Sequence, residues 1–266
     1  MRRANKGILL YSLLVCQAAL MAALPTASRP AEYGMRRADP LPAQRGILQT
    51  TNSSGRKGAY YLPAGYNLKA TPMMLAYHGT GGNGDGILSA FVGLAEKYHF
   101  IIVAPDSRYH PIYGYTWEVG TEPGEITPDY LHALACMDEV LAFPYVSIDS
   151  RHVLAVGFSG GGSSAPYIAS NSTRFTASAT LHGGVFTSGL GGNKIRPWFS
   201  TGQGDTIRTP AHVQGQADSM MYAGFPNVEF HVYSGGHELI AMEIEEMTIW
   251  WLGTATRKVY LPILKK

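Results

Sequence analysis

The residues around Ser159 have the pattern of a serine nucleophile on a sharp turn. Ser159 is the centre of the pentapeptide GFSGG, residues 157–161, which follows the apolar run of residues 153–156 and precedes a helical stretch. A serine hydroxyl is a weak nucleophile unless a strained strand-to-helix turn holds it toward a base, and small residues two positions before and after it let that turn close. No Gly-Lys-Ser/Thr sequence follows, so the glycines do not match a phosphate-binding loop. The pattern therefore predicts acyl-transfer chemistry at Ser159.

Asp205 and His237 have the order and surroundings expected of the acid and the base that such a serine needs. Asp205 lies in a turn after the strand-like residues 197–201, and His237 ends a Ser-Gly-Gly turn after the strand-like residues 228–233. In these roles the histidine takes and returns the serine proton, and the carboxylate holds the imidazole in its productive tautomer. We therefore predict a catalytic triad of Ser159, Asp205 and His237.

Other histidines and carboxylates fit these roles less well. His231 lies within a predicted strand and His182 follows an earlier one, whereas His237 combines a preceding strand, a glycine turn and a following helix. Asp106, after the apolar residues 100–104, is the main rival acid, but it precedes the serine. In the chain order expected here, the acid follows the nucleophile.

A second glycine-rich turn, HGTGGN at residues 78–83, follows the apolar run of residues 73–77. The tetrahedral intermediate of acyl transfer carries a negative oxygen, and two backbone N–H groups aimed at that oxygen stabilise it. One donor comes from the residue after the nucleophile and the other from such an upstream turn. We predict that Gly160 and Thr80 form this oxyanion hole and that His78 braces the turn.

The elements that must position these residues alternate along the chain. Short β-rich runs alternate with helical stretches, which is typical of a mostly parallel, doubly wound sheet with helices on both faces. The sequence predicts one α/β domain with about eight strands and no large lid, because residues 183–196 are short and glycine-rich. Strands are expected near residues 46–51, 59–62, 72–77, 100–104, 152–157, 177–181, 198–201 and 228–233, and helices near residues 87–99, 128–141, 161–170, 210–222 and 238–252.

The first residues have the composition of an export signal. A basic start is followed by the apolar residues 7–24 and by the small residues of 25–28. We predict a signal peptide over residues 1–28 with an uncertain cut site. An uncleaved membrane anchor is the alternative, because the apolar run has about the minimum length that spans a bilayer.

The rest of the chain is expected to be a loose lead-in over residues 29–45 and a catalytic domain over residues 46–266. A chain of 266 residues that is 45% apolar can bury a full core. Its net charge of +2 includes three basic residues of the predicted signal, so no electrostatic feature favours nucleic acid or an anionic membrane. We expect a secreted or periplasmic protein without stable membrane association after signal removal.

Cysteine and ligand patterns indicate a domain without disulfides or cofactors. Cys16 and Cys136 are the only cysteines, so removal of the signal leaves Cys136 unpaired, and its helical apolar surroundings predict a buried, inert thiol. No zinc, calcium-loop or dinucleotide spacing is present, so we expect no metal and no cofactor.

Taken together, these motifs resemble the α/β-hydrolase superfamily. Within it, the Leu-Pro-x-Gly-Tyr sequence at residues 62–66, before the oxyanion turn, is similar to the start of secreted polyhydroxybutyrate depolymerases and feruloyl esterases. The resemblance covers roughly residues 46–252. It implies a serine esterase that works through an acyl-enzyme. The chain departs from that branch in lacking paired cysteines and a second polymer-binding domain, which favours a small-molecule or oligomeric ester over a crystalline polymer.

The residues that contact substrate are expected near this site. The predicted ester is a short-acyl, hydroxyalkanoate or aryl (feruloyl-type) ester, and Trp117, Tyr115 and Phe158 are the candidate contacts, because aromatic rings can stack on an aryl ester. Packing of the loop against the body is the equal alternative for Trp117 and Tyr115. A serine peptidase or an acyltransferase would use the same triad, and a non-catalytic binding protein on this fold is a further alternative.

Overall fold

The computed structural model describes residues 40–49, 56–67, 69–184 and 189–253. All of these described residues belong to one compact unit. The predicted signal peptide lies outside the described residues, and so does the predicted lead-in up to residue 39. No helix in the described part of the chain is long and apolar enough to cross a membrane.

The described residues form an eight-stranded sheet with the order β1-β2-β4-β3-β7-β8-β9-β10, and a separate two-stranded hairpin, β5-β6. The strands of the large sheet are β1 (Gln44–Leu48), β2 (Gly58–Leu62), β3 (Thr71–Tyr77), β4 (Ile101–Pro105), β7 (Ile148–Phe158), β8 (Ala177–Leu181), β9 (Arg196–Gly202) and β10 (Glu229–Tyr233), and the hairpin strands are β5 (Arg108–His110) and β6 (Gly114–Thr116). The helices are α1 (Gly84–Tyr98), α2 (Pro128–Leu141), α3 (Gly161–Asn171), α4 (Pro210–Tyr222) and α5 (Ala241–Leu252).

Most of the large sheet is parallel. β1 pairs antiparallel with β2, β2 pairs antiparallel with β4, and every other pair in the sheet is parallel. The carboxyl ends of the parallel strands therefore meet at one edge, which is where ligand sites form in open α/β sheets. The predicted α/β fold with a mostly parallel sheet of about eight strands is confirmed.

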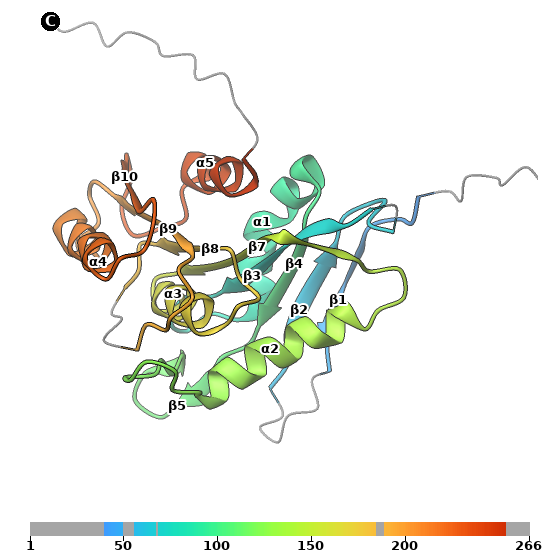
Figure 1. The fold of residues 1–266 in the computed structure, drawn as a ribbon, viewed down its shortest axis with the longest axis horizontal. Helices are drawn as coiled ribbons and strands as arrows, with labels where there is room; N and C mark the ends of the chain where they lie inside the picture. The colour runs from blue at the N-terminus through green and yellow to red at the C-terminus, as the bar shows by residue number, and fades with distance from the viewer. Residues whose placement is uncertain (1–39, 50–55, 68, 185–188, 254–266) are drawn as a thin grey trace, which may run out of the picture. The chain divides into compact units, whose positions relative to one another are not determined.

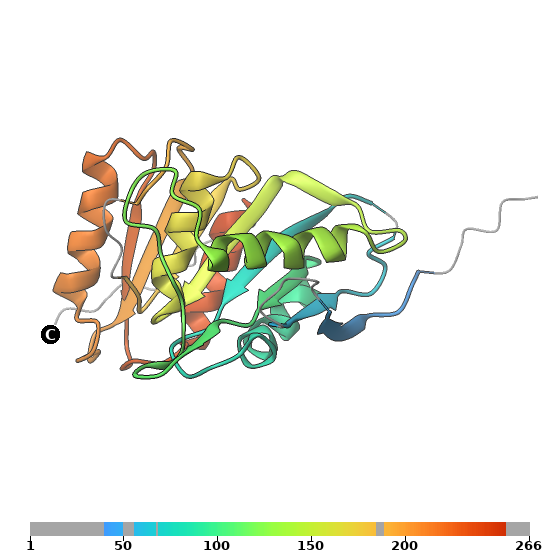
Figure 2. The ribbon, with the colours of Figure 1, turned by 90° about the horizontal axis from the view of Figure 1, so that it is seen from below.

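Helices cover both faces of this sheet. α1 and α5 pack on one face, and α2, α3 and α4 pack on the other (Figures 1 and 2). Successive side chains of a strand point to opposite faces. In β3, Met73 and Leu75 accordingly join the cluster under α2 and α3, whereas Met74 and Ala76 join the cluster under α1 and α5.

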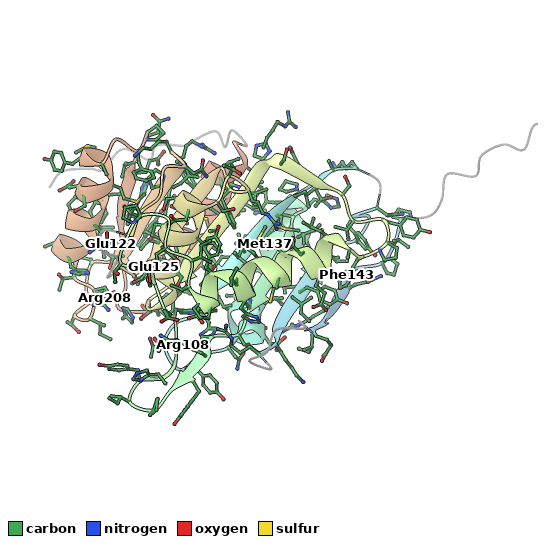
Figure 3. The ribbon with its side chains drawn as sticks, turned by 60° about the horizontal axis from the view of Figure 1, so that its bottom comes forward. Arg108, Glu122, Glu125, Met137, Phe143 and Arg208 are labelled. Carbon is green, nitrogen blue, oxygen red and sulfur yellow. The ribbon has the colours of Figure 1, made fainter. Side chains whose placement is uncertain are left out.

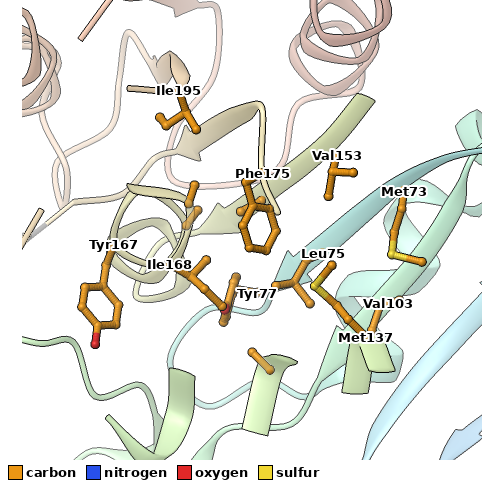
Figure 4. Close-up of a cluster of buried hydrophobic side chains, with 14 of the residues drawn as sticks. Met73, Leu75, Tyr77, Val103, Met137, Val153, Tyr167, Ile168, Phe175 and Ile195 are labelled. Carbon is orange, nitrogen blue, oxygen red and sulfur yellow. The ribbon is translucent and has the colours of Figure 1, made fainter. Parts of the chain in front are cut away.

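The larger core cluster lies between the sheet and the helices α2 and α3. Figure 4 shows Leu75 and Tyr77 of β3 near Met137 of α2, Ile168 of α3 and Phe175. These side chains are at most 2% exposed. A strand that is buried on both faces reads as a continuous apolar run, and for that reason β3 and β4 were predictable from sequence.

Two parts of the chain differ from the sequence prediction. β1 begins at Gln44, and Leu41 packs against the core, so the described residues 40–45 belong to the folded body and the predicted lead-in ends earlier than expected. The β5-β6 hairpin lies where only an aromatic loop was expected. Arg108 of β5 lies beside the start of α2 (Figure 3), with its Nε 3.7 Å from Asp129 Oδ2.

Two smaller predictions concern Cys136 and the lid. Cys136 lies fully buried in α2, and burial raises the pKa of its thiol, as expected for an inert core cysteine. Residues 189–195 contain no helix. Residues 185–188 lie outside the described part of the chain, so the absence of a lid stays a prediction.

Candidate active site

The Ser159 turn joins β7 to α3 and is closed by contacts that only glycine permits. Ser159 has a φ of 50°, in the left-handed region that is strained for a serine. A Cβ added to Gly157 would lie 2.0 Å from the Gly161 carbonyl oxygen, and one added to Gly161 would lie 2.5 Å from the Tyr77 carbonyl oxygen. The Ser159 N–H donates to the Leu181 carbonyl at 3.0 Å. The backbone thus fixes the direction of the Ser159 side chain.

Ser159, His237 and Asp205 form a continuous hydrogen-bonded chain. The Ser159 Oγ lies 2.9 Å from His237 Nε2, and His237 Nδ1 lies 2.8 Å from Asp205 Oδ2. The His237 side chain is 16% exposed and the Asp205 side chain is fully buried. With the proton on Nδ1, the imidazole donates to the carboxylate and its Nε2 is free to accept the hydroxyl proton. The three residues that the sequence singled out are therefore within proton-transfer distance.

Asp205 is held as a carboxylate by donors on both of its oxygens. The backbone N–H groups of Ile207 and Arg208 donate to Oδ1 at 2.8 and 2.7 Å. His237 and His182 each place Nδ1 within 2.9 Å of Oδ2. Burial opposes ionisation of the Asp205 carboxyl, but these four donors outweigh it and hold its pKa below the usual range.

Thr80 and Gly160 lie side by side at the nucleophile turn. A Cβ added to Gly160 would lie 3.3 Å from the Thr80 backbone nitrogen. One added to Gly79 would lie 3.3 Å from Ser159 Cβ, so the upstream turn packs directly on the serine. The Gly81 N–H donates to the Tyr115 carbonyl at 2.7 Å, which ties this turn to the β5-β6 hairpin. The arrangement suits two backbone donors aimed at one oxygen beside Ser159.

His78, which the sequence predicted to brace the turn, has structural contacts, and so do Asp106 and His231, which it did not assign to the triad. His78 is 2% exposed, its Nε2 accepts from the Ser107 N–H at 3.1 Å, and burial lowers the pKa of its imidazole. Asp106 accepts from the Gly84 N–H at 2.7 Å, at the start of α1. His231 stacks on the Trp198 ring at 3.8 Å, away from the triad.

The candidate substrate contacts divide into two groups. Trp117 is 7% exposed and donates from Nε1 to the His78 carbonyl at 2.8 Å, so its position favours support of the oxyanion turn over contact with substrate. Phe158 is half-buried, with its ring 5.2 Å from the His237 ring, and Tyr115 is 50% exposed. A substrate contact at Phe158 or Tyr115 stays a prediction.

Sequence reasoning missed two residues at the site, His182 and Glu243. His182 follows β8, has a φ of 50°, and lies fully buried between Asp205 and Glu243. Its Nε2 is 3.2 Å from Glu243 Oε2, and Glu243 belongs to α5. The only signal in the sequence was a histidine at the carboxyl end of a predicted strand, and no local pattern connects it to Glu243.

The ligand atoms of His182, Asp205 and His237 lie within 4.8 Å of one another, close enough to hold a metal ion. Each of these atoms already has a partner. Asp205 Oδ2 accepts from both imidazoles, and the outer nitrogens of the rings face Glu243 and Ser159. Hydrogen bonding accounts for the cluster, so we assign no metal to it.

Comparison with known sequences connects the chain to esterases. No protein-family model matches it. The chain is 31% identical over 176 residues to acetylxylan esterase A of Aspergillus awamori, a match that covers 62% of this chain and 55% of that protein. It is 29% identical over 217 residues to acetylxylan esterase A of Aspergillus ficuum, covering 76% and 68%. The chain thus spans about half to two thirds of the length of the curated relatives it matches.

Solved structures with a similar fold include serine hydrolases and esterases. A ferulic acid esterase matches with a TM-score of 0.61 and 15% identity over 79% of this chain and 98% of its own. The fluorophosphonate-binding serine hydrolase F of Staphylococcus aureus matches with a TM-score of 0.58 and 15% identity over 79% and 99%. The chain has the α/β-hydrolase fold, and the predicted resemblance to its serine esterases is confirmed. The link to polyhydroxybutyrate depolymerases stays a prediction.

Proposed function

We propose that this protein is a serine hydrolase of carboxylic esters, with Ser159 as nucleophile, His237 as general base and Asp205 as the acid that orients the histidine. The observation that carries the proposal is the hydrogen-bonded chain from the partly buried Ser159 Oγ through His237 to the buried Asp205. The similarity to acetylxylan esterases over most of the chain supports the same reaction.

The first half of the reaction forms an acyl-enzyme. Ser159 Oγ attacks the ester carbonyl carbon, and its proton passes to His237 Nε2 across the 2.9 Å contact. The carbonyl oxygen becomes an oxyanion and accepts from the N–H groups of Thr80 and Gly160. Asp205 stabilises the imidazolium through Nδ1–H. The proton then passes to the alkoxy oxygen, the C–O bond breaks, and the alcohol leaves.

The second half returns the enzyme to its resting state. Water takes the place of the alcohol, and His237 removes one of its protons as the water oxygen attacks the acyl carbon. The second tetrahedral intermediate collapses, His237 passes the proton taken from water to Ser159 Oγ, and the carboxylic acid leaves. The serine proton thus leaves with the alcohol, and a proton from water replaces it through the same imidazole nitrogen.

Short acyl groups on a carbohydrate are the substrates that we propose. The relatives are named for an acetylated polysaccharide. Beside the oxyanion turn, at Gly81 and Gly82, lies a cavity of about 490 Å³ that Tyr109 and Tyr115 help to line. Both tyrosines are at least half exposed, and their rings are 5.6 Å apart. Exposed aromatic rings can pack against the apolar face of a sugar, so this cavity is suited to the alcohol side of the ester.

We also propose that the chain is exported. The basic start and the apolar run of residues 7–24 are the support, and both lie outside the described residues. N-terminal sequencing of the protein secreted by an expression host tests this. A mature start between residues 25 and 30 is expected, and an intact Met1 on a membrane-bound protein would contradict it.

The test of the function is acid release from p-nitrophenyl acetate and from acetylated xylan, with Ser159→Ala as the variant. Loss of nearly all turnover in a folded variant is expected, because the remaining oxyanion donors give only a small residual rate. Product analysis distinguishes hydrolysis from transfer to an alcohol. Unchanged turnover in Ser159→Ala would contradict the proposal.

The test of the substrate is a comparison of KM values for the two esters. Tyr109→Ala and Tyr115→Ala should raise the KM for acetylated xylan while leaving p-nitrophenyl acetate unaffected. Tyr222→Ala, which removes a tyrosine that is 83% exposed at the end of α4, is the matched control. If Tyr109→Ala and Tyr115→Ala had the same KM for acetylated xylan as the control variant, the sugar-binding role of the cavity would be refuted.

A further inference from the structure

His182 is the only fully buried histidine in the described residues whose two ring nitrogens both face carboxylate oxygens. Nδ1 is 2.9 Å from Asp205 Oδ2 and Nε2 is 3.2 Å from Glu243 Oε2, and all three side chains are inaccessible to solvent. The Gly202 N–H also points at Nδ1 from 3.3 Å and could donate to it only if this nitrogen carried no proton, but the carboxylate oxygen of Asp205, at 2.9 Å, is the closer partner. An ionised carboxylate only accepts hydrogen bonds, so both contacts are satisfied together when the ring carries a proton on each nitrogen.

We propose that His182, backed by Glu243, is a positioning residue that stays doubly protonated and donates to the same oxygen of Asp205 that serves His237. This inference rests on the proposed function, because it assigns a task to a neighbour of the triad. The ring nitrogens of His182 contact Asp205 and Glu243, and His182 acts through Asp205.

Burial alone would favour a neutral His182, so the charges around it decide the matter. Asp205 lies in the turn after β9, Glu243 lies on α5, and the His237 ring lies 5.7 Å away and perpendicular. Burial lowers the pKa of His182, but Glu243 and then Asp205 outweigh it, and the pKa is raised above its usual value. Two carboxylates with one imidazolium between them leave a single net negative charge, which is less costly to bury than two unpaired carboxylates.

The consequence for catalysis concerns how strongly Asp205 attracts the proton of His237. A carboxylate oxygen that accepts two charge-assisted bonds stabilises a new imidazolium less than one devoted to a single donor. Asp205 therefore orients His237 while leaving it neutral and ready to accept the Ser159 proton. The backbone fits this role, because the Leu181 carbonyl just before His182 accepts from the Ser159 N–H, so one turn supports both the nucleophile and the acid.

The direct test is nitrogen-15 NMR of the histidine rings in the wild-type protein at about pH 8, where a histidine with an ordinary pKa near 6.5 is neutral. His182, assigned with His182→Gln, should show protons on both ring nitrogens. In Glu243→Gln the counter-charge is gone, and the ring should carry one proton at the same pH. A singly protonated His182 in the wild type would overturn the proposal.

The catalytic test is the pH profile of kcat/KM. Glu243→Gln should move the midpoint of the acidic limb to higher pH by about one pH unit, the size of one charge-assisted bond, with KM unchanged. The matched control is Glu246→Gln, on the same helix but bonded to the Tyr233 hydroxyl at 2.8 Å, and it should keep the wild-type profile. A merely structural role would lower stability without moving the limb.

These two tests also separate this proposal from the proposed function. If the wild type showed no ester hydrolysis while His182 carried two ring protons, the function would fail and the protonation state would stand. If hydrolysis depended on Ser159 while both glutamate variants kept the same acidic limb, the role of His182 would fail and the function would stand.

Discussion

Replacing Asp205 by Asn changes one atom of the triad, and the surrounding donors dictate how the new side chain sits. The N–H groups of Ile207 and Arg208 donate to Oδ1 at 2.8 and 2.7 Å, and an amide satisfies both only by placing its oxygen there. The NH₂ group must then occupy the position of Oδ2, where the Nδ1 atoms of His182 and His237 now donate. Donors would face the NH₂ group unless His237 moves its proton to Nε2 and His182 loses the proton on Nδ1.

His237 would therefore carry its proton on Nε2, the nitrogen that has to accept from Ser159 Oγ. The base is lost although every heavy atom stays in place. We expect kcat in Asp205→Asn to fall about 1,000- to 10,000-fold, which corresponds to about 4–5.5 kcal/mol of transition-state stabilisation. KM should change little, because Asp205 is buried and does not touch substrate.

The assay is steady-state hydrolysis of p-nitrophenyl acetate at neutral pH, with near-ultraviolet circular dichroism as the check on folding. Thr201→Val is the matched control, because it removes a longer contact to Oδ2, at 3.3 Å, without changing the charge of the carboxyl. A folded Asp205→Asn protein with kcat within tenfold of the wild type would refute the reasoning.

Three further predictions concern stability and the turns. The pKa of Asp205 is lower in the folded protein than in the unfolded chain, so its contribution to stability is complete above about pH 4 and is lost as the pH falls through the folded pKa. The Tm difference between the wild type and Asp205→Asn should therefore be constant near neutral pH and shrink at acid pH, which thermal melts over a range of pH values would measure. Gly157→Ala should lower Tm by several degrees and abolish activity, because the added Cβ would lie 2.0 Å from the Gly161 carbonyl oxygen. The control is Gly215→Ala in α4, where the added Cβ has open space; this variant should raise Tm slightly and keep activity. Trp117→Phe should lower the free energy of unfolding by about 1 kcal/mol, because it loses the hydrogen bond to the His78 carbonyl. Its KM values for an acetyl and a feruloyl ester should equal those of the wild type. A KM rise confined to the feruloyl ester would show that Trp117 contacts substrate.

The triad was predictable from sequence because it depends on few physical constraints. β3 and residues 153–157 of β7 are buried apolar runs, β9 is buried over residues 197–202, and parallel strands must bring their carboxyl ends to one edge. A polar residue in the turn after such a strand therefore has a known place. Ser159, Asp205 and His237 each follow a strand in this way, so their convergence follows from the topology alone.

The rest of the site depends on contacts that no local pattern records. β5 and β6 are three residues each with partly exposed side chains, and the hairpin is held by pairing to the oxyanion turn, so periodicity gave no signal for it. For Trp117 the sequence left substrate contact and packing of its loop as equal alternatives, and its indole fills a space under the same turn. His182 and Glu243 are 61 positions apart, and only the packing of α5 on the sheet connects them.

The central claim, that Ser159 is the activated nucleophile of this chain, is tested most directly by a fluorophosphonate probe followed by peptide mapping of the labelled protein. One adduct per chain is expected, on the peptide that contains Ser159, with labelling much slower in His237→Ala because the hydroxyl then has no base. Modification at another residue, or equal labelling rates in the wild type and His237→Ala, would contradict the account.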